Sequence, residues 1–102
     1  MYKCIKFQKR KNVKGGIALK NLLPIGSVVL LKNGQKKVMV YGRKQIQSGT
    51  NTLWDYISCL YPEGNIDENH CFLFNHEDID MIMFIGYQDE EEFMFQEVLN
   101  EF

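Results

Sequence analysis

The sequence predicts a small α+β domain: a mostly antiparallel β-sheet or half-open barrel of about five strands, with one C-terminal helix. Three observations lead to this fold class. Short apolar segments separated by turn residues recur along the middle of the chain. Two of these segments flank an Asn-Gly dipeptide, which is typical of a β-hairpin. The last part of the chain carries apolar side chains at helical spacing.

The first predicted element is a hairpin with strands at residues 27–31 and 36–47. Asn33 and Gly34 are its expected loop residues, because both tolerate the positive φ angles of a type I′ turn. This turn fixes one register, in which apolar side chains lie opposite each other. The expected pairs are Val28 with Met39 and Val29 with Val38.

Three further strands are predicted after the hairpin. Residues 52–61 are rich in aromatic and β-branched side chains, and residues 70–74 form a shorter apolar run. Asn75 is expected to cap a single helical turn over residues 75–79, whose acidic side chains suit the positive end of the helix dipole. Residues 80–87 are almost continuously apolar, which indicates a central strand covered on both faces.

The clearest helix is predicted over residues 89–102. Asp89 and Glu92 have the spacing of a capping box, and the acidic side chains favour the positive end of the helix dipole. One face of this helix carries an apolar stripe, which needs a sheet or a partner to pack against. The stripe consists of Phe95, Val98, Leu99 and Phe102.

The 102 residues suit one globular domain, which we expect to span residues 23–102. Residues 1–22 form a basic N-terminal segment, expected to be mobile or an edge strand. All 12 Lys and Arg lie no later than residue 44, and all 13 Asp and Glu lie at residue 55 or beyond. The two halves either fold against each other or present a charge dipole that steers a partner.

The composition excludes membrane and secreted disulfide-rich classes. No apolar run reaches the roughly 20 residues that a transmembrane helix requires, and the N-terminus lacks the apolar core of a secretory signal. The three cysteines are too few and too widely spaced for a disulfide framework, so reduced thiols are expected. We therefore expect a cytoplasmic protein that does not bind a membrane.

The sequence predicts no catalytic, cofactor-binding or metal site. Cys59, His70, Cys71 and His76 do not have the spacing of zinc ligands. The sequence also contains no P-loop, no dinucleotide-binding fingerprint and no nucleophile elbow. These observations favour a non-enzymatic protein.

Two regions are candidate surfaces for a protein partner. The first surrounds the third strand and its exit, because Trp and Tyr dominate interface hot spots. Its members are Trp54, Tyr56, Tyr61, Pro62, Glu63, His76 and Glu77. The second is the predicted helix, where Phe93 and Met94 widen the apolar surface. The alternative is that the aromatic side chains belong to the core.

The basic N-terminal half supports a second function. Lysines interleaved with Tyr2, Ile5 and Phe7 are compatible with a small β-barrel that binds nucleic acid. We favour a protein partner over nucleic acid, because the same lysines also serve to keep an edge element in solution. The sequence is compatible with a homo-oligomer as well.

Three ordered blocks resemble a family of small uncharacterised proteins of Gram-positive bacteria. The blocks are LPIGSVVLLK at 23–32, LYPEGN at 60–65 and LFNHEDI at 73–79. Members of the family are often encoded in type VII secretion clusters, beside LXG-type polymorphic toxins. The resemblance implies an accessory, non-enzymatic protein that binds a toxin or another secretion substrate, as a dedicated chaperone does. A regulatory or immunity-like toxin binder is the alternative within the same setting.

Overall fold

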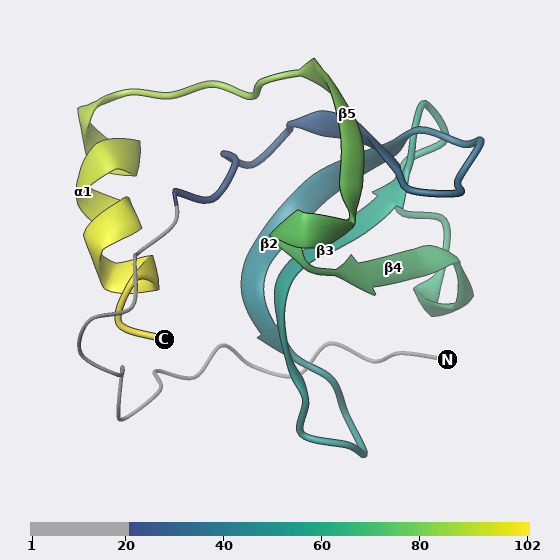
Figure 1. Cartoon of the computed structure of the whole chain (residues 1–102), viewed down its shortest axis with the longest axis horizontal. Helices are drawn as coiled ribbons and strands as arrows, with labels where there is room; N and C mark the ends of the chain where they lie inside the picture. The colour runs from purple at the N-terminus through teal and green to yellow at the C-terminus, as the bar shows by residue number, and fades with distance from the viewer. Residues whose placement is uncertain (1–20) are drawn as a thin grey trace.

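The computed structural model describes residues 21–102, so residues 1–20 of the predicted basic segment 1–22 lie outside the described residues. One antiparallel sheet has the strand order β4-β3-β2-β1-β5, and the helix α1 (Glu90–Leu99) follows it (Figure 1). The predicted fold class, a small antiparallel sheet with one C-terminal helix, is confirmed. The strands are β1 (Val28–Leu31), β2 (Val38–Ile46), β3 (Leu53–Leu60), β4 (Cys71–Phe74) and β5 (Ile79–Phe84). Two short 3₁₀ turns are η1 (Glu68–His70) and η2 (His76–Asp78).

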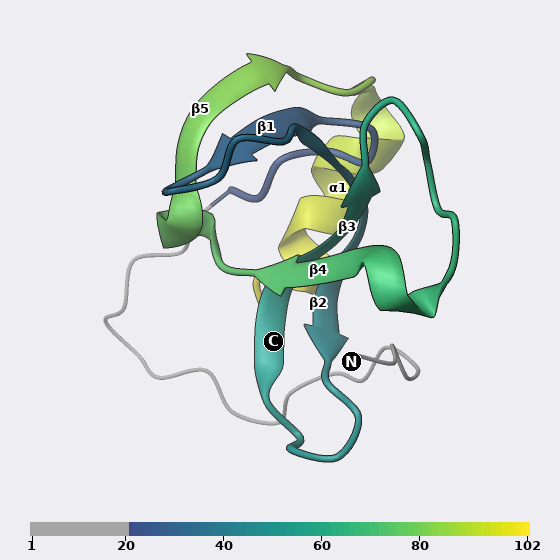
Figure 2. The same ribbon diagram turned by 90° about the vertical axis from the view of Figure 1, so that its right-hand side faces the viewer.

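The sheet is strongly curved, with β4 and β5 at its two edges (Figure 2). A separate apolar cluster forms on each of its faces. The larger cluster includes the α1 residue Leu99, so the helix packs on that side; its buried members are Leu22, Leu23, Val29, Val38, Val40, Tyr56, Phe74 and Leu99. The smaller cluster consists of Ile57, Cys71 and Leu73, with Tyr41 and Trp54 packed against it. The central strands β2 and β3 are therefore covered on both faces.

The register of the predicted hairpin is confirmed, because Val28 pairs with Met39 and Val29 with Val38. The turn itself differs from the predicted type I′ turn. Of the two expected loop residues, only Asn33 has a positive φ angle, at 64°.

The turn differs because the end of β1 pairs with β5 and no longer with β2. The Lys32 N–H donates to the carbonyl oxygen of Asp78 at 2.9 Å, and Leu31 pairs with Ile79 of β5. The Gly34 N–H instead closes a separate turn onto the carbonyl oxygen of Leu31 at 2.8 Å. A tight two-residue loop cannot form once the end of β1 is held by its other neighbour.

The strand predicted to be central lies at an edge of the sheet. Within the described residues, β5 pairs with β1 on one side and with no strand on the other. All its residues from Asp80 to Phe84 are exposed. The prediction was wrong because an unbroken apolar run indicates apolar surroundings without saying whether they belong to the same chain.

The single helical turn predicted at residues 75–79 is confirmed as η2. The Asn75 N–H donates to the carboxylate of Asp78 at 2.8 Å. Asn75 Oδ1 accepts from the Asp55 N–H at 3.1 Å, and the Asp55 carboxylate accepts from the His76 N–H at 2.9 Å. This exchange of hydrogen bonds ties η2 to β3 and sets the position at which β5 begins.

The C-terminal helix is shorter than the predicted range of 89–102. Asp89 is its N-cap, as predicted, and its carboxylate accepts from the Glu92 N–H at 3.1 Å. Only part of the apolar stripe is covered: Leu99 and Phe102 are buried, whereas Phe95 and Val98 are exposed. Across residues 21–102, no helix combines the length and apolar character that crossing a bilayer requires.

Candidate functional site

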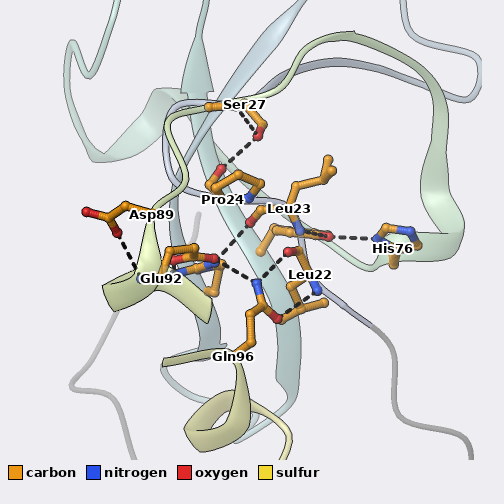
Figure 3. Close-up of polar contacts among 11 residues, drawn as sticks. Leu22, Leu23, Pro24, Ser27, His76, Asp89, Glu92 and Gln96 are labelled. Atoms are coloured by element: carbon orange, nitrogen blue, oxygen red, sulfur yellow. Dashed lines mark hydrogen bonds and ion pairs between the residues drawn. The ribbon is translucent and has the colours of Figure 1, made fainter. Parts of the chain in front are cut away.

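A buried polar network holds the strap, residues 22–24, between the sheet and the helix (Figure 3). Arg43 of β2 donates to both carboxylate oxygens of Glu92 in α1, at 2.5 and 2.8 Å. It also donates to the carbonyl oxygen of Leu23 at 3.2 Å. The Arg43 side chain is only 4% exposed, so this bidentate pair lies inside the protein. Arg43 holds the pKa of Glu92 below its ordinary value, which keeps the carboxylate ionised.

Gln96 of α1 completes this attachment. Its Nε2 donates to the carbonyl oxygen of Leu22 and to Glu92, both at 2.7 Å. The Leu22 N–H donates back to Gln96 Oε1 at 3.2 Å. The side-chain amide thus pairs with the strap as a backbone amide would, which fixes the helix to the chain just before β1.

The other end of the network is a Tyr–His pair. The Tyr56 hydroxyl accepts from the Leu23 N–H at 2.9 Å and lies 2.7 Å from Nδ1 of His76. Burial raises the pKa of Tyr56 to about 12, so the hydroxyl stays neutral and can donate to the histidine. Tyr56 is fully buried and its ring stacks on Phe74, with centroids 5.0 Å apart. The hydroxyl therefore links the strap to η2.

The basic and acidic halves of the sequence meet in the described structure. Besides the Arg43–Glu92 pair, Lys36 Nζ lies 2.9 Å from the Glu63 carboxylate, and Lys44 Nζ lies 3.5 Å from that of Asp55. Lys36 lowers the pKa of Glu63 through their hydrogen bond. Of the two interpretations of the charge pattern, folding of the halves against each other holds for these residues.

Two of the predicted contact residues belong to the structural framework. Tyr56 lies in the core, so its assignment to a contact surface was wrong. Trp54 is half-buried against the smaller apolar cluster, and its indole N–H donates to Gln47 Oε1 at 3.1 Å. The period-two pattern of β3 could not reveal this, because both faces of that strand are covered.

The remaining predicted residues fall into three groups. Tyr61, Pro62 and Glu63 are exposed just after β3, and Phe93 and Met94 are exposed on α1. Figure 1 shows these two groups on opposite sides of the molecule, so they do not form one surface. The third group is η2: His76 there is half-buried, and Glu77 is exposed.

An open apolar depression of about 500 Å³ lies beside the first of these groups. We call it the Tyr61 depression; it is lined by Gly26, Val28, Lys37, Met39, Tyr61, Met83 and Phe84. Lys37 Nζ lies 5.7 Å from the centroid of the Tyr61 ring, which places one cation at the edge of an apolar surface. The depression therefore joins the strands β1, β2 and β5 to a predicted contact residue.

The contribution of β5 to this surface was not predicted from the sequence. Met83 and Phe84 were assigned to the core because their strand is apolar throughout. The same lack of alternation also fits an edge strand whose side chains are exposed on both faces, and the structure shows an exposed edge strand. Periodicity alone does not separate these two cases.

Within residues 21–102, no group of three or more His, Cys, Asp or Glu side chains is arranged to hold a metal ion. Cys59 and Cys71 are both buried and reduced. Burial raises the pKa of Cys59, so this thiol is protonated at neutral pH. His70 pairs with Asp67, with Nδ1 2.7 Å from the carboxylate.

Comparison with known proteins places most of the described chain in one family. A family model described as a domain of unknown function (DUF4176) matches residues 22–95. No curated protein and no solved structure matches the chain. The matched range begins in the strap and includes the Tyr61 depression and the first turns of α1.

Proposed function

Because the chain belongs to the family described as domain of unknown function DUF4176, we propose a function from its geometry: it is a non-enzymatic module that binds a protein partner. The proposed partner is an LXG-type toxin or another type VII secretion substrate, and the proposed role is that of a cytoplasmic accessory protein or chaperone. This choice of partner rests on the resemblance of the three sequence blocks to proteins encoded beside such toxins.

The observation that carries the proposal is the Tyr61 depression. Its lining combines an aromatic ring, two methionines and a phenylalanine with the ammonium group of Lys37. Aromatic residues are enriched in interface hot spots, and methionine side chains adapt to irregular partner surfaces. A depression of this composition suits an apolar side chain inserted by another protein.

The polar network supports the non-enzymatic part of the proposal. Its ionisable side chains are held by one another or by the backbone: Arg43 binds Glu92, and Tyr56 binds Leu23 and His76. Groups committed to such contacts are positioned to keep the strap and helix in place. We therefore assign the network to the support of the binding surface.

Isothermal titration of the protein with an LXG-type toxin tests the proposal. We expect a stoichiometric complex, weakened about thirtyfold by Tyr61→Ala, because a central aromatic anchor contributes that much. Tyr87→Ala is the matched control: Tyr87 is exposed outside the lining of the depression, so this variant should bind as the wild type does. No binding, or equal effects of the two variants, would refute the proposal.

The same titration separates the accessory role from the immunity-like alternative. An export chaperone should bind a toxin fragment that lacks the active toxin domain. An immunity-like protein should bind the isolated toxin domain and inhibit it. Strong binding to the toxin domain alone would replace the accessory role with the alternative.

A further inference from the structure

Two cysteines face each other across neighbouring strands of the sheet. Cys59 of β3 lies directly opposite Cys71 of β4 in their antiparallel ladder. Residues paired in this way project from the same face of a sheet. Here that face carries the smaller apolar cluster, to which Cys71 and Leu73 belong. Both cysteines are reduced and buried, with exposed fractions of 2% and 5%.

The Cys59–Cys71 pair is of the non-hydrogen-bonded kind. The Tyr61 N–H donates toward β2, to the carbonyl oxygen of Lys37 at 3.0 Å. Because backbone groups alternate in direction along a strand, the N–H and C=O of Cys59 also point toward β2 and away from Cys71. Pairs of this kind have Cα atoms about 4.5 Å apart. A disulfide requires a Cα separation of about 4.4–6.8 Å, so the backbone already meets this requirement.

The reduced Cys71 side chain makes a weak contact that a disulfide can replace. Its thiol donates to the carbonyl oxygen of Glu68, in η1, at 3.3 Å. A thiol is a weak hydrogen-bond donor, so this contact opposes rotation of the side chain toward Cys59 only weakly. Oxidation would exchange the hydrogen bond for a covalent bond.

The position of Cys71 gives a dissolved reagent a route to the pair. Cys71 is the first residue of the four-residue β4, which pairs with β3 alone among the described strands. The preceding connection, residues 61–70, is exposed at every position except the half-buried Gly64. A short strand at the edge of a sheet opens locally at a lower free energy than a core strand. Exposure to water then favours the thiolate, which is the form that reacts.

We propose that Cys59 and Cys71 form a modification site, at which a small disulfide such as oxidised glutathione converts the two thiols into a cross-strand disulfide. The Cys71 thiolate attacks one sulfur of oxidised glutathione, which gives a mixed disulfide and releases one glutathione thiolate. The Cys59 thiolate then attacks the Cys71 sulfur, and the second glutathione leaves as a thiolate. The two protons lost by the cysteines pass through water to the released thiolates. One small disulfide is thus reduced for each protein disulfide that forms.

The disulfide would act on the connection that carries Tyr61. Residues 60–70 lie between the two cysteines, and Tyr61 lines the Tyr61 depression. Joining the ends of this connection restricts the unfolded chain and stabilises the folded protein. The site does not rest on the proposed function, because the disulfide forms without a partner.

Oxidised glutathione, applied to the full chain under native conditions, is the probe for this site. After alkylation of the remaining thiols, peptide mass spectrometry should find a cross-link between Cys59 and Cys71, and dithiothreitol should reverse it. Cys4→Ser removes the third thiol of the chain and should give the same cross-link. Oxidation should raise the melting temperature of this variant by about 5 °C or more.

A matched control moves one thiol along the same face of β4. In the Cys4→Ser background, Cys71→Ala combined with Leu73→Cys places the second thiol opposite Ile57. This thiol is then a diagonal neighbour of Cys59, about 7–8 Å away, which is beyond the usual reach of a disulfide. Its cross-link should form at least about tenfold more slowly. If circular dichroism shows that this control does not fold, Cys71→Ala alone replaces it, and oxidation should leave its melting temperature unchanged.

Four results would overturn the modification site. The first is the absence of the Cys59–Cys71 cross-link in the native protein, and the second is a cross-link that appears only in urea. The third is an oxidised Cys4→Ser protein whose melting temperature has not risen. The fourth is a matched control that forms its cross-link as fast as the natural pair does. None of these measurements involves a toxin, so the modification site and the proposed function fail separately.

Discussion

Tyr56 contributes to stability through its hydroxyl group, which is bound on both sides in the core. Tyr56→Phe removes the acceptor of the Leu23 N–H and the partner of His76 Nδ1. Because a buried N–H is then left without a partner, we expect a loss of about 1–3 kcal/mol in the free energy of unfolding, measured by urea denaturation. Tyr61→Phe is the matched control on an exposed ring and should change this free energy by less than about 0.5 kcal/mol. Similar effects of the two variants would contradict the role of the network.

The Glu92 carboxylate makes the free energy of unfolding depend on pH in the acidic range. Arg43 lowers the pKa of Glu92 below its ordinary value of 4.5, so the native state favours the ionised form. The resulting stability is fully present above about pH 4.5 and is lost as the pH falls through the lower native pKa. Urea denaturation at several pH values should therefore show a decline that Glu92→Gln reduces.

Two further results check this assignment. At neutral pH, Glu92→Gln should cost about 3 kcal/mol, because the buried Arg43 guanidinium loses its counter-charge. Arg43→Met should reduce the acid dependence as Glu92→Gln does, since either variant removes the pair. The exposed carboxylates of Glu63 and Asp67 also have lowered pKa values and will leave a residual acid dependence in both variants. Acid dependence equal to that of the wild type in either variant would rule out the pair as its source.

Sequence patterns at the residue scale identified some roles but not their placement. The spacing of Asp89 and Glu92 located the start of α1, since capping depends only on local chain geometry. The aromatic character of Tyr56 and Tyr61 was recognised, but one lies in the core and the other at the depression. Burial is decided by distant parts of the chain, here the strap and α1, which no local pattern specifies.

At the scale of elements, Gly86 allows two segments to pack closely: the one just before β1 and the one just after β5. The segment before β1 and the segment after β5 approach so closely that a Cβ on Gly86 would lie 2.1 Å from the carbonyl oxygen of Ile25. The Gly86 N–H also donates to Ser27 Oγ at 3.0 Å. Gly86→Ala should therefore displace the end of β5 and destabilise the protein by about 3 kcal/mol or more.

Gly49→Ala is the control for this substitution. Nothing lies within 4 Å of a Cβ at Gly49, but its φ of +95° is unfavourable for alanine, so a cost of about 1 kcal/mol is expected. Thermal or urea denaturation compares the two variants. A Gly86→Ala protein at least as stable as the Gly49→Ala protein would contradict the close approach.

The strands and helices themselves were largely predictable from the sequence. Which strands lie side by side in the sheet was not. The hairpin register followed from apolar pairing around Asn33 and Gly34, and η2 followed from its cap and acidic residues. The position of β5 did not follow, because strand order depends on long-range pairing with β1. The same competition explains the turn: β1 satisfies its end by pairing with β5, and the predicted type I′ geometry is lost.

At the scale of the whole molecule, the fold places a rigid framework beside an apolar surface. The strap, β2 and α1 are joined by buried hydrogen bonds between segments far apart in the sequence, such as Leu22 and Gln96. On the other side, β1, β2 and β5 present the Tyr61 depression. Composition predicted a compact α+β domain. The separation of the framework from the apolar surface follows only from the order of the strands in the sheet.

The central claim is that this apolar surface is where the protein meets its partner. Hydrogen exchange of the protein, measured alone and in complex with an LXG-type toxin, the proposed partner, is the most direct test of this claim. We expect increased protection of the amides in β1, in β5 and at residues 61–63 on complex formation. Protection confined to α1 or to the loop between β2 and β3, with these segments unchanged, would contradict it.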